Sequence, residues 1–324
     1  MDTLAGGRDH GGGLDAACAR WGGGRAQWLD LSTGINPVPY PLPDLPASVW
    51  TALPDSAASA RLIVAARRFW EVPDRLGILP VPGASAAIAR LPGVAKGSGA
   101  GVHIPAPTYN EHAAAFAAAG WRVMTGPEAP GAGACVLVHP NNPDGRLWSA
   151  GELPQSGLLI LDESFCDIAP EASLLRRAAQ RPETLVLKSF GKFWGLAGLR
   201  LGFVIGAPAL LATLREVTGP WPVSGPALAI GAAALEDPAW ADATRERLRE
   251  DAERLDGLMT RAGAVAIGGT TLFRLYRTGN AAGMQARLAR GRVWSRCFPY
   301  SEHWLRLGLP GSEAGWQQLA AALA

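Results

Sequence analysis

The feature that most constrains this chain is an alternation of short apolar runs with alanine-rich segments across residues 102–205. The apolar runs have the length of buried strands, and they lie at residues 102–105, 134–139, 158–162, 184–188 and 199–205. Helices are predicted at 60–70, 111–120 and 174–180. Buried runs separated by helices indicate parallel strands with crossover connections. The predicted fold class is therefore α/β, with a mostly parallel sheet covered by helices on both faces.

The length of 324 residues exceeds that of one ordinary compact core, and the composition changes twice along the chain. Residues 1–45 are rich in Gly and Pro and predict an N-terminal arm. Residues 46–224 form the predicted large domain, and residues 225–324 form a predicted smaller α+β domain. That smaller domain is expected to contain a long charged helix at 239–262 and short strands at 265–268, 272–276, 293–297 and 304–307.

Composition excludes several classes of function. Hydrophobic residues at 48% and charged residues at 18% are typical of a globular protein, and a net charge of +2 argues against nucleic acid or an anionic membrane as a partner. No apolar run is long enough to span a membrane, and no secretory signal is evident, so a cytoplasmic protein is expected. The spacing of the cysteines and histidines argues against a metal site and suits reduced thiols, the four cysteines being Cys18, Cys135, Cys166 and Cys297.

Lysine is rare, and its placement is informative. Only three of the 30 basic residues are lysines, and two of them, Lys188 and Lys192, lie within five residues just after an apolar run. A neutral lysine amine forms an imine with an aldehyde, whereas the guanidinium of arginine stays protonated and does not. We therefore interpret Lys192 as an anchoring amine for an aldehyde cofactor.

Polar residues that follow other predicted strands complement such a cofactor. Asp162 ends an apolar run, and a buried carboxylate there needs a cationic partner such as a protonated pyridine nitrogen. Asn142 lies in a turn at 139–145 and is a candidate for binding a ring oxygen, while Tyr109 is a candidate for stacking on a flat ring. Taken singly, each has an ordinary structural explanation: a helix cap or salt bridge, a plain turn and a core tyrosine.

A phosphate site is predicted from small residues and one arginine. Ala84 and Ser85 open a helix after Gly83, where free amides and a hydroxyl suit a phosphate dianion. Ser189 adds a hydroxyl, and Arg200, eight residues after Lys192, adds a permanent cation.

In this order along the chain, these features resemble the aspartate-aminotransferase-like superfamily of pyridoxal-phosphate enzymes (fold type I), over nearly the whole length. The resemblance implies pyridoxal 5′-phosphate as cofactor, with Lys192 bound to its aldehyde, Asp162 to the pyridine nitrogen and Asn142 to the ring oxygen. It further implies that Tyr109 stacks on the ring and that the phosphate is held by Ala84, Ser85, Ser189 and Arg200.

The chain departs from the superfamily pattern at two places. Phe165 stands where many members have a tyrosine that binds the ring oxygen. Residues 53–56 contain no tyrosine, although many members send one from the partner subunit to the cofactor phosphate. The resemblance implies a homodimer, but these departures leave open whether the subunits share a site.

Further segments resemble the threonine-phosphate decarboxylases of cobalamin biosynthesis. They are His10-Gly11-Gly12 and residues 29–37, 162–165 and 220–224. This resemblance implies decarboxylation of L-threonine O-3-phosphate to (R)-1-amino-2-propanol O-2-phosphate. Arg306 would then orient the substrate carboxylate, and the other expected substrate-binding residues are His10, Gly34, Asn36 and Arg296.

Three alternatives stay open at this point. Histidinol-phosphate aminotransferases are similar in the same motifs, although the His-Gly-Gly segment and residues 32–37 favour the decarboxylase. A pyridoxal-phosphate-sensing transcription regulator would need a DNA-binding domain, for which the first 45 residues are too few. A non-catalytic phosphate-binding module would leave Lys192 unexplained.

Overall fold

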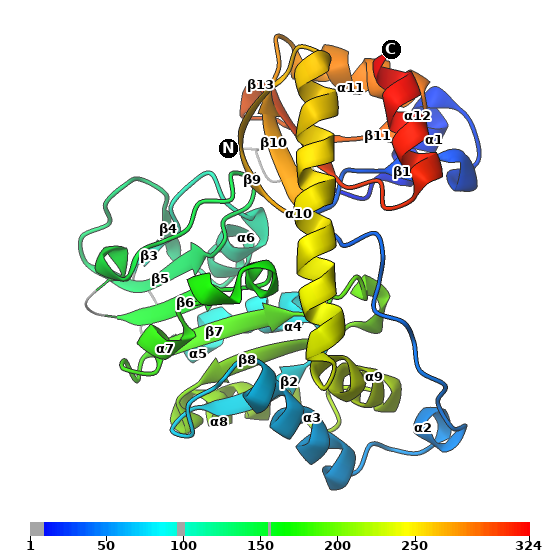
Figure 1. The fold of residues 1–324 in the computed structure, drawn as a ribbon. Helices are drawn as coiled ribbons and strands as arrows, with labels where there is room; N and C mark the ends of the chain where they lie inside the picture. Colours follow the sequence, from blue (N-terminus) through cyan, green and yellow to red (C-terminus); the bar gives the residue numbers. More distant parts are fainter. Residues whose placement is uncertain (1–9, 96–100, 155–156) are drawn as a thin grey trace. The chain divides into compact units, whose positions relative to one another are not determined.

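The computed structural model describes residues 10–95, 101–154 and 157–324 (Figure 1). The chain forms two compact units, one made of Pro39–Arg245 and the other of the described residues up to Val38 together with Glu246–Ala324. We call them the large unit and the small unit, and describe each by itself. Within the described ranges, no helix combines the length and apolarity needed to cross a membrane.

The large unit is built on a seven-stranded sheet of order β2-β8-β7-β6-β5-β3-β4. The strands are β2 (Gly77–Val81), β3 (Gly101–His103), β4 (Arg122–Met124), β5 (Ala132–Val138), β6 (Leu158–Asp162), β7 (Thr184–Ser189) and β8 (Gly202–Gly206). Strand β8 runs antiparallel to both its neighbours, and every other adjacent pair is parallel. The mostly parallel sheet expected from the alternating apolar runs is confirmed.

Helices cover both faces of this sheet. Phe203 and Val204 are consecutive in β8, so their side chains point to opposite faces. Val204 belongs to an apolar core whose members include residues of the helices α4 (Ala84–Ile88), α5 (Leu91–Val94), α6 (Asn110–Ala118) and α8 (Pro208–Thr218). On the other face, Phe203 packs edge-on against Trp70, which ends helix α3 (Ser56–Phe69), with ring centroids 4.9 Å apart.

In the large unit, the sequence patterns miss two strands and misplace the start of a third. Strand β2 contains Pro80, which has no backbone N–H to donate to a neighbouring strand. The proline is tolerated because β2 lies at the sheet edge. Strand β4 is an edge strand of three residues, too short to give a pattern. Strand β8 begins at Gly202, not at residue 199, because Ala197–Leu199 forms a 3₁₀ turn and Arg200 takes a left-handed conformation with φ of 53°.

The small unit contains a four-stranded antiparallel sheet of order β12-β13-β10-β9. Its strands are β9 (Val265–Thr270), β10 (Phe273–Arg277), β12 (Arg296–Phe298) and β13 (Ser301–Gly308). The run expected as one strand at 293–297 is divided between β11 (Val293–Trp294) and β12. The unit also holds helices α1 (Leu14–Trp21), α11 (Ala281–Arg290) and α12 (Glu313–Leu323).

The two units differ from the three segments expected from composition. Strand β1 (Leu29–Asp30) pairs in parallel with β11, and the Gly308 amide donates to the Leu31 carbonyl at 2.7 Å. Residues 10–38 of the expected arm are therefore part of the small unit, and residues 39–45 belong to the large unit. The second boundary falls not at 224 but within helix α10 (Pro238–Arg261), because helix α9 (Gly225–Leu235) packs against α3 of the large unit.

Candidate active site

A pocket of the large unit collects all the residues expected to bind the cofactor. Strands β5, β6 and β7 are parallel, so their carboxyl ends meet at one edge of the sheet, where ligands bind in such folds. The loops and strand ends at that edge supply Asn142, Asp162 and Ser189. The expected residues that line the pocket are Ala84, Ser85, Tyr109, Asn142, Asp162, Ser189, Lys192 and Arg200.

Asp162 is an almost fully buried carboxylate that stays charged. Burial by itself raises the pKa of this carboxyl, but the hydrogen bonds and charge of His112, together with Ser164, outweigh burial and hold the pKa below its ordinary value. The Ser164 amide donates to Oδ1 at 3.0 Å, and the Ser164 hydroxyl donates to the same oxygen. An anion is therefore available in the pocket to bind a cationic ring nitrogen.

His112 is a site residue that the sequence interpretation missed. Its Nε2 lies 2.7 Å from Asp162 Oδ2, and the His112 side chain is 0% exposed. Within the described residues, its Nδ1 has no hydrogen-bond partner. The sequence contains a pattern that could have indicated it. Tyr109 is the N-cap of helix α6 and His112 lies three residues later within the helix, and residues at that spacing share a helix face. The rings of Tyr109 and His112 meet edge-on with centroids 6.1 Å apart.

Tyr109 keeps its phenol proton. Burial is the largest cause that raises its pKa to about 12, followed by the charges of Asp162 and Glu111, while a hydrogen bond with Ser85 and the charge of Arg200 oppose the rise. At neutral pH the side chain therefore presents a neutral ring and a hydroxyl to the pocket.

The expected phosphate cradle is closely packed around Gly83. Gly83 has φ of +86°, and a Cβ at this position would lie 2.6 Å from Nη2 of Arg200. A Cβ on Gly202, at the start of β8, would lie 2.5 Å from the Ala84 amide nitrogen. Both glycines therefore let the start of α4, the first residues of β8 and the Arg200 guanidinium approach each other. Arg200 also donates to the Ala197 carbonyl at 3.1 Å.

Lys192 is half-buried and lines the same pocket as these groups. Its Nζ lies 5.3 Å from the ring centroid of Phe165, which is 4% exposed and also lines the pocket. The apolar ring of Phe165 thus lies in this pocket where many members of the superfamily have a tyrosine hydroxyl. Lys188, by contrast, is buried and paired with Glu163 at 2.8 Å. Of the two described lysines, Lys192 is the one that lines this pocket.

The expected substrate-binding residues lie in the small unit, on adjoining segments. Arg296 and Arg306 face each other as partners in the β12–β13 ladder, so their side chains share a sheet face. Arg306 is 6% exposed and donates to the Ser32 carbonyl at 2.7 Å. The Ser32 hydroxyl in turn accepts from the Gly12 amide at 2.6 Å, two residues after His10.

Asn36 and Gly34 lie in the same buried segment as Ser32. The Asn36 side chain is 1% exposed, and its Oδ1 accepts from Nη2 of Arg247 at 2.7 Å and from the Val38 amide at 3.1 Å. His10 is exposed. The structure thus brings the segments of His10, Gly34, Asn36 and Arg306 together within one unit.

One cluster outside this pocket has the composition of a metal site. His139, Glu163 and Cys166 are buried and have potential ligand atoms near one another. However, His139 Nδ1 accepts the Trp148 amide at 3.0 Å, so its Nε2 carries the proton and donates to the Ala172 carbonyl at 2.7 Å. Neither ring nitrogen offers a free lone pair, and the cluster is a structural network.

The pocket residues fit pyridoxal phosphate chemically. A primary amine can react with the aldehyde, an anionic carboxylate can bind the pyridinium nitrogen, and an amide can bind the ring oxygen. Two serine hydroxyls and a guanidinium suit a phosphate. The close approach of Gly83 to Arg200 provides a cradle that any larger residue would fill.

Comparison with known proteins identifies the family. Residues 47–323 match the model of aminotransferase class I and II. Threonine-phosphate decarboxylases from Sinorhizobium sp and Pseudomonas aeruginosa are 41% and 40% identical to this chain, and each match covers 97% of both chains. Histidinol-phosphate aminotransferase from Sinorhizobium meliloti, solved in complex with pyridoxal-5′-phosphate, superposes with a TM-score of 0.80, covering 95% of this chain and 92% of its own, at 21% identity.

The structural likeness confirms the predicted fold (fold type I). The two sequence relatives confirm the resemblance to threonine-phosphate decarboxylases that the motifs indicated. The chain therefore belongs to the aminotransferase class I and II family and, within it, to the group of threonine-phosphate decarboxylases.

Proposed function

We propose that this protein uses pyridoxal phosphate to decarboxylate L-threonine O-3-phosphate, giving (R)-1-amino-2-propanol O-2-phosphate for cobalamin biosynthesis. The observation that carries the proposal is the convergence of Lys192 with Asp162, Asn142 and the Ser85–Ser189–Arg200 group in a single pocket. The identity of about 40% to threonine-phosphate decarboxylases over 97% of the chain supports the choice of reaction.

The residues of the pocket have separate tasks in this proposal. Lys192 would bind the cofactor aldehyde, Asp162 would hold the pyridine nitrogen in its protonated form, and Asn142 would bind the ring oxygen. Tyr109 would stack on the ring, while Ala84, Ser85, Ser189 and Arg200 would hold the phosphate. When bound, the cofactor supplies a ring that accepts the electron pair released as carbon dioxide leaves. Nζ of Lys192 would carry the proton that replaces the carboxylate on the substrate α-carbon.

Two anionic groups of the substrate need cationic partners. Arg306 is proposed to orient the carboxylate, and Arg296, with His10 and Asn36, to bind the phosphate; Gly34 would shape the same segment. The pairing of Arg296 with Arg306 across β12 and β13 supports this division, since two guanidinium groups on one sheet face suit a doubly anionic ligand. Holding the carboxylate bond perpendicular to the cofactor ring would select decarboxylation over proton loss.

We also propose a cytoplasmic homodimer. The four cysteines are free, which suits a reducing compartment. The large unit exposes Leu42, Trp50, Leu53, Val217 and Trp221, each more than half exposed. Large apolar side chains gathered on one surface are typical of protein–protein contacts. Two grooves share Pro54, and one is lined by Trp221 and the other by Leu42 and Trp50; a second copy of the chain is the proposed occupant.

The deciding experiment follows carbon dioxide release from L-threonine O-3-phosphate by the purified, cofactor-loaded protein. Borohydride reduction followed by peptide mapping should place the cofactor label on Lys192. Replacement of Lys192 by Ala or Arg should abolish both labelling and turnover, because neither side chain can form the imine. Amino transfer from histidinol phosphate to 2-oxoglutarate without carbon dioxide release would instead establish the aminotransferase alternative and reject the decarboxylase.

A further inference from the structure

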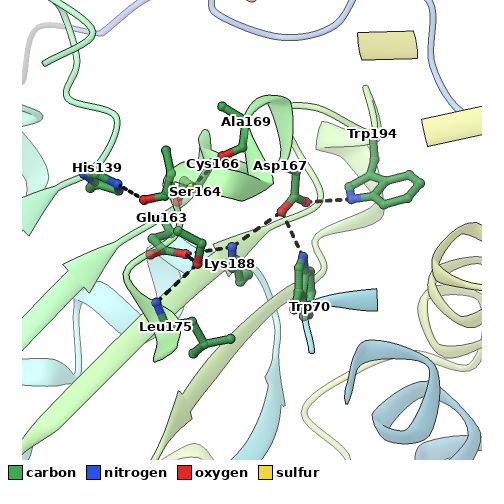
Figure 2. A network of polar contacts seen from close by, with 12 residues as sticks. Trp70, His139, Glu163, Ser164, Cys166, Asp167, Ala169, Leu175, Lys188 and Trp194 are labelled. Carbon is green, nitrogen blue, oxygen red and sulfur yellow. Dashed lines mark hydrogen bonds and ion pairs between the residues drawn. The ribbon is translucent and has the colours of Figure 1, made fainter. Parts of the chain in front are cut away.

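A buried charged network joins Lys188 to Glu163 and Asp167 (Figure 2). It lies on the sheet face opposite the pocket. In the register of β6 and β7, Asp162 pairs with Leu187, so Asp162 and Ser189 point to one face and Lys188 points to the other. Asp162 and Ser189 line the pocket described above, whereas Lys188 and Asp167 line a separate cavity. The residues of the network therefore lie close in sequence to residues of the site, but they do not line its pocket.

Lys188 is the centre of the network. Its side chain is 3% exposed, and its Nζ lies 2.8 Å from Glu163 Oε2 and 3.6 Å from Asp167 Oδ1. Burial is the largest influence and by itself lowers the pKa of Lys188, but the charges of Glu163 and Asp167 together raise it above its ordinary value. The Lys188 ammonium therefore stays charged, and its attraction to the two carboxylates is strong because little water screens it.

Both oxygens of each carboxylate accept a hydrogen bond. Glu163 accepts from the Ser173 hydroxyl at 2.8 Å and from the Leu174 amide at 2.7 Å. Asp167 accepts from two indole N–H groups, Trp70 at 2.8 Å on Oδ1 and Trp194 at 3.0 Å on Oδ2. A buried ion pair whose carboxylate oxygens all accept hydrogen bonds holds its members in one geometry.

Each end of the network is next to a residue of the pocket. Glu163 follows Asp162 directly, Lys188 precedes Ser189 directly, and Trp194 comes two residues after Lys192. Trp194 is fully buried and stacks on Phe190 with centroids 5.1 Å apart, so both sides of Lys192 in the loop are anchored in the core. Fixing the members of the network therefore fixes the backbone from which the pocket side chains project.

We infer that the Lys188–Glu163–Asp167–Trp194 network is a positioning device that sets where Lys192 stands relative to Asp162 and Ser189. The inference rests on the proposed function, since it concerns the lysine that would bind the cofactor. None of the four residues lines the pocket, so all act through the backbone of the residues that do.

A matched pair of variants tests it. Trp194→Phe and Trp70→Phe each remove one indole donor to the same Asp167 carboxylate, but only Trp194 belongs to the loop of Lys192. The readouts are the pH midpoint of the absorption change of the bound cofactor and the rate at which borohydride labels Lys192 in the holoenzyme. Trp194→Phe should move the midpoint by about half a pH unit or more, a shift comparable to losing one hydrogen bond. Trp70→Phe should leave both readouts as in the unaltered protein.

Asp167→Asn is the second variant, and it tests the inference even if the Trp194→Phe protein does not fold. It removes one buried negative charge while leaving the Lys188–Glu163 pair, so the protein should fold. It should change both readouts in the same direction as Trp194→Phe. Equal effects of Trp194→Phe and Trp70→Phe, or a folded Asp167→Asn protein with unaltered readouts, would overturn the inference. Failure of the proposed function is recognised separately, because the unaltered protein would then release no carbon dioxide from L-threonine O-3-phosphate.

Discussion

His112 Nε2 stands 2.7 Å from Asp162 Oδ2 in a part of the large unit that is closed to solvent, where the two side chains are 0% and 3% exposed. The contact joins helix α6 to the end of strand β6, and it is a main reason why the buried Asp162 carboxyl retains a low pKa. Because Asp162 is the proposed partner of the pyridine nitrogen, His112 controls the charge of the group on which the cofactor's electron-accepting character depends.

Replacing His112 by Phe should weaken cofactor binding and slow turnover. The phenyl ring fills most of the space but leaves a buried carboxylate without its partner, and breaking such a pair costs about 3–5 kcal/mol. We expect the Kd for pyridoxal phosphate, measured by absorption titration, to rise by at least about tenfold, with a lower Tm. His112→Gln keeps an N–H donor and should recover part of both. An unchanged Kd in the Phe variant would show that cofactor binding by Asp162 does not depend on His112.

The contribution of Asp162 to stability should depend on pH in a defined direction. Its pKa in the folded protein is lower than in the unfolded chain, so its stabilising effect is complete above the ordinary aspartate value of about 3.9 and is lost as the pH falls through the folded value. The difference in free energy of unfolding between the unaltered protein and Asp162→Asn should therefore shrink between about pH 5 and pH 3 in urea titrations. A difference that grows in acid would contradict the assigned charge.

The cofactor pocket is largely predictable from sequence because its residues sit at fixed places relative to buried strands. Asn142, Asp162 and Ser189 follow or end parallel strands, and parallel strands deliver their carboxyl ends to one edge. The order of the motifs then adds Ser85 and Arg200. All of these positions can be read from local patterns without knowing any tertiary contact.

Contacts between distant segments carry no such local signal. The pairing of Leu29 with Val293, which helps to make residues 10–38 of the expected arm part of the small unit, depends on two short strands far apart in sequence. The ion pair of Glu163 with Lys188 requires knowing that β6 and β7 are neighbours in the sheet. His112 was overlooked for a different reason, since a histidine in an alanine-rich helix looks like a surface residue until its partner is located.

The phosphate cradle should not tolerate a side chain at Gly83. Alanine there would combine an unfavourable positive φ with a Cβ 2.6 Å from Nη2 of Arg200, and would displace the guanidinium from the proposed phosphate site. Gly83→Ala should raise the Kd for pyridoxal phosphate by about tenfold or more, consistent with loss of a charged hydrogen bond. Gly93→Ala is a suitable control, because nothing lies within 4 Å of a Cβ at that position. Equal affinities in the two variants would remove Arg200 from the cradle.

The proposed roles of Arg296 and Arg306 can be separated by comparing a phosphorylated with an unphosphorylated substrate. Arg296→Gln should raise the KM for L-threonine O-3-phosphate by about ten- to a hundredfold, as expected for loss of a charged hydrogen bond, while leaving the rate measured with unphosphorylated L-threonine unchanged. Arg306→Gln should impair both substrates, because both carry the carboxylate. Arg277→Gln, an exposed arginine of the same sheet, should affect neither. A phosphate-independent effect of Arg296→Gln would assign that residue to another role.

The exposed tryptophans of the large unit should hold the proposed dimer together. Trp50 and Trp221 are 67% and 58% exposed, and burying two such rings against a second copy would contribute several kcal/mol at about 25 cal/mol per Å² of apolar surface. Glutamate at both positions would place charges in that contact, so sedimentation of the double variant should show a monomer while that of the unaltered protein shows a dimer. Val265→Glu, at an exposed apolar position of the small unit, should remain dimeric. If the double variant stays dimeric with the same dissociation constant, the interface lies on another surface, because two buried charges cannot leave an apolar contact undisturbed.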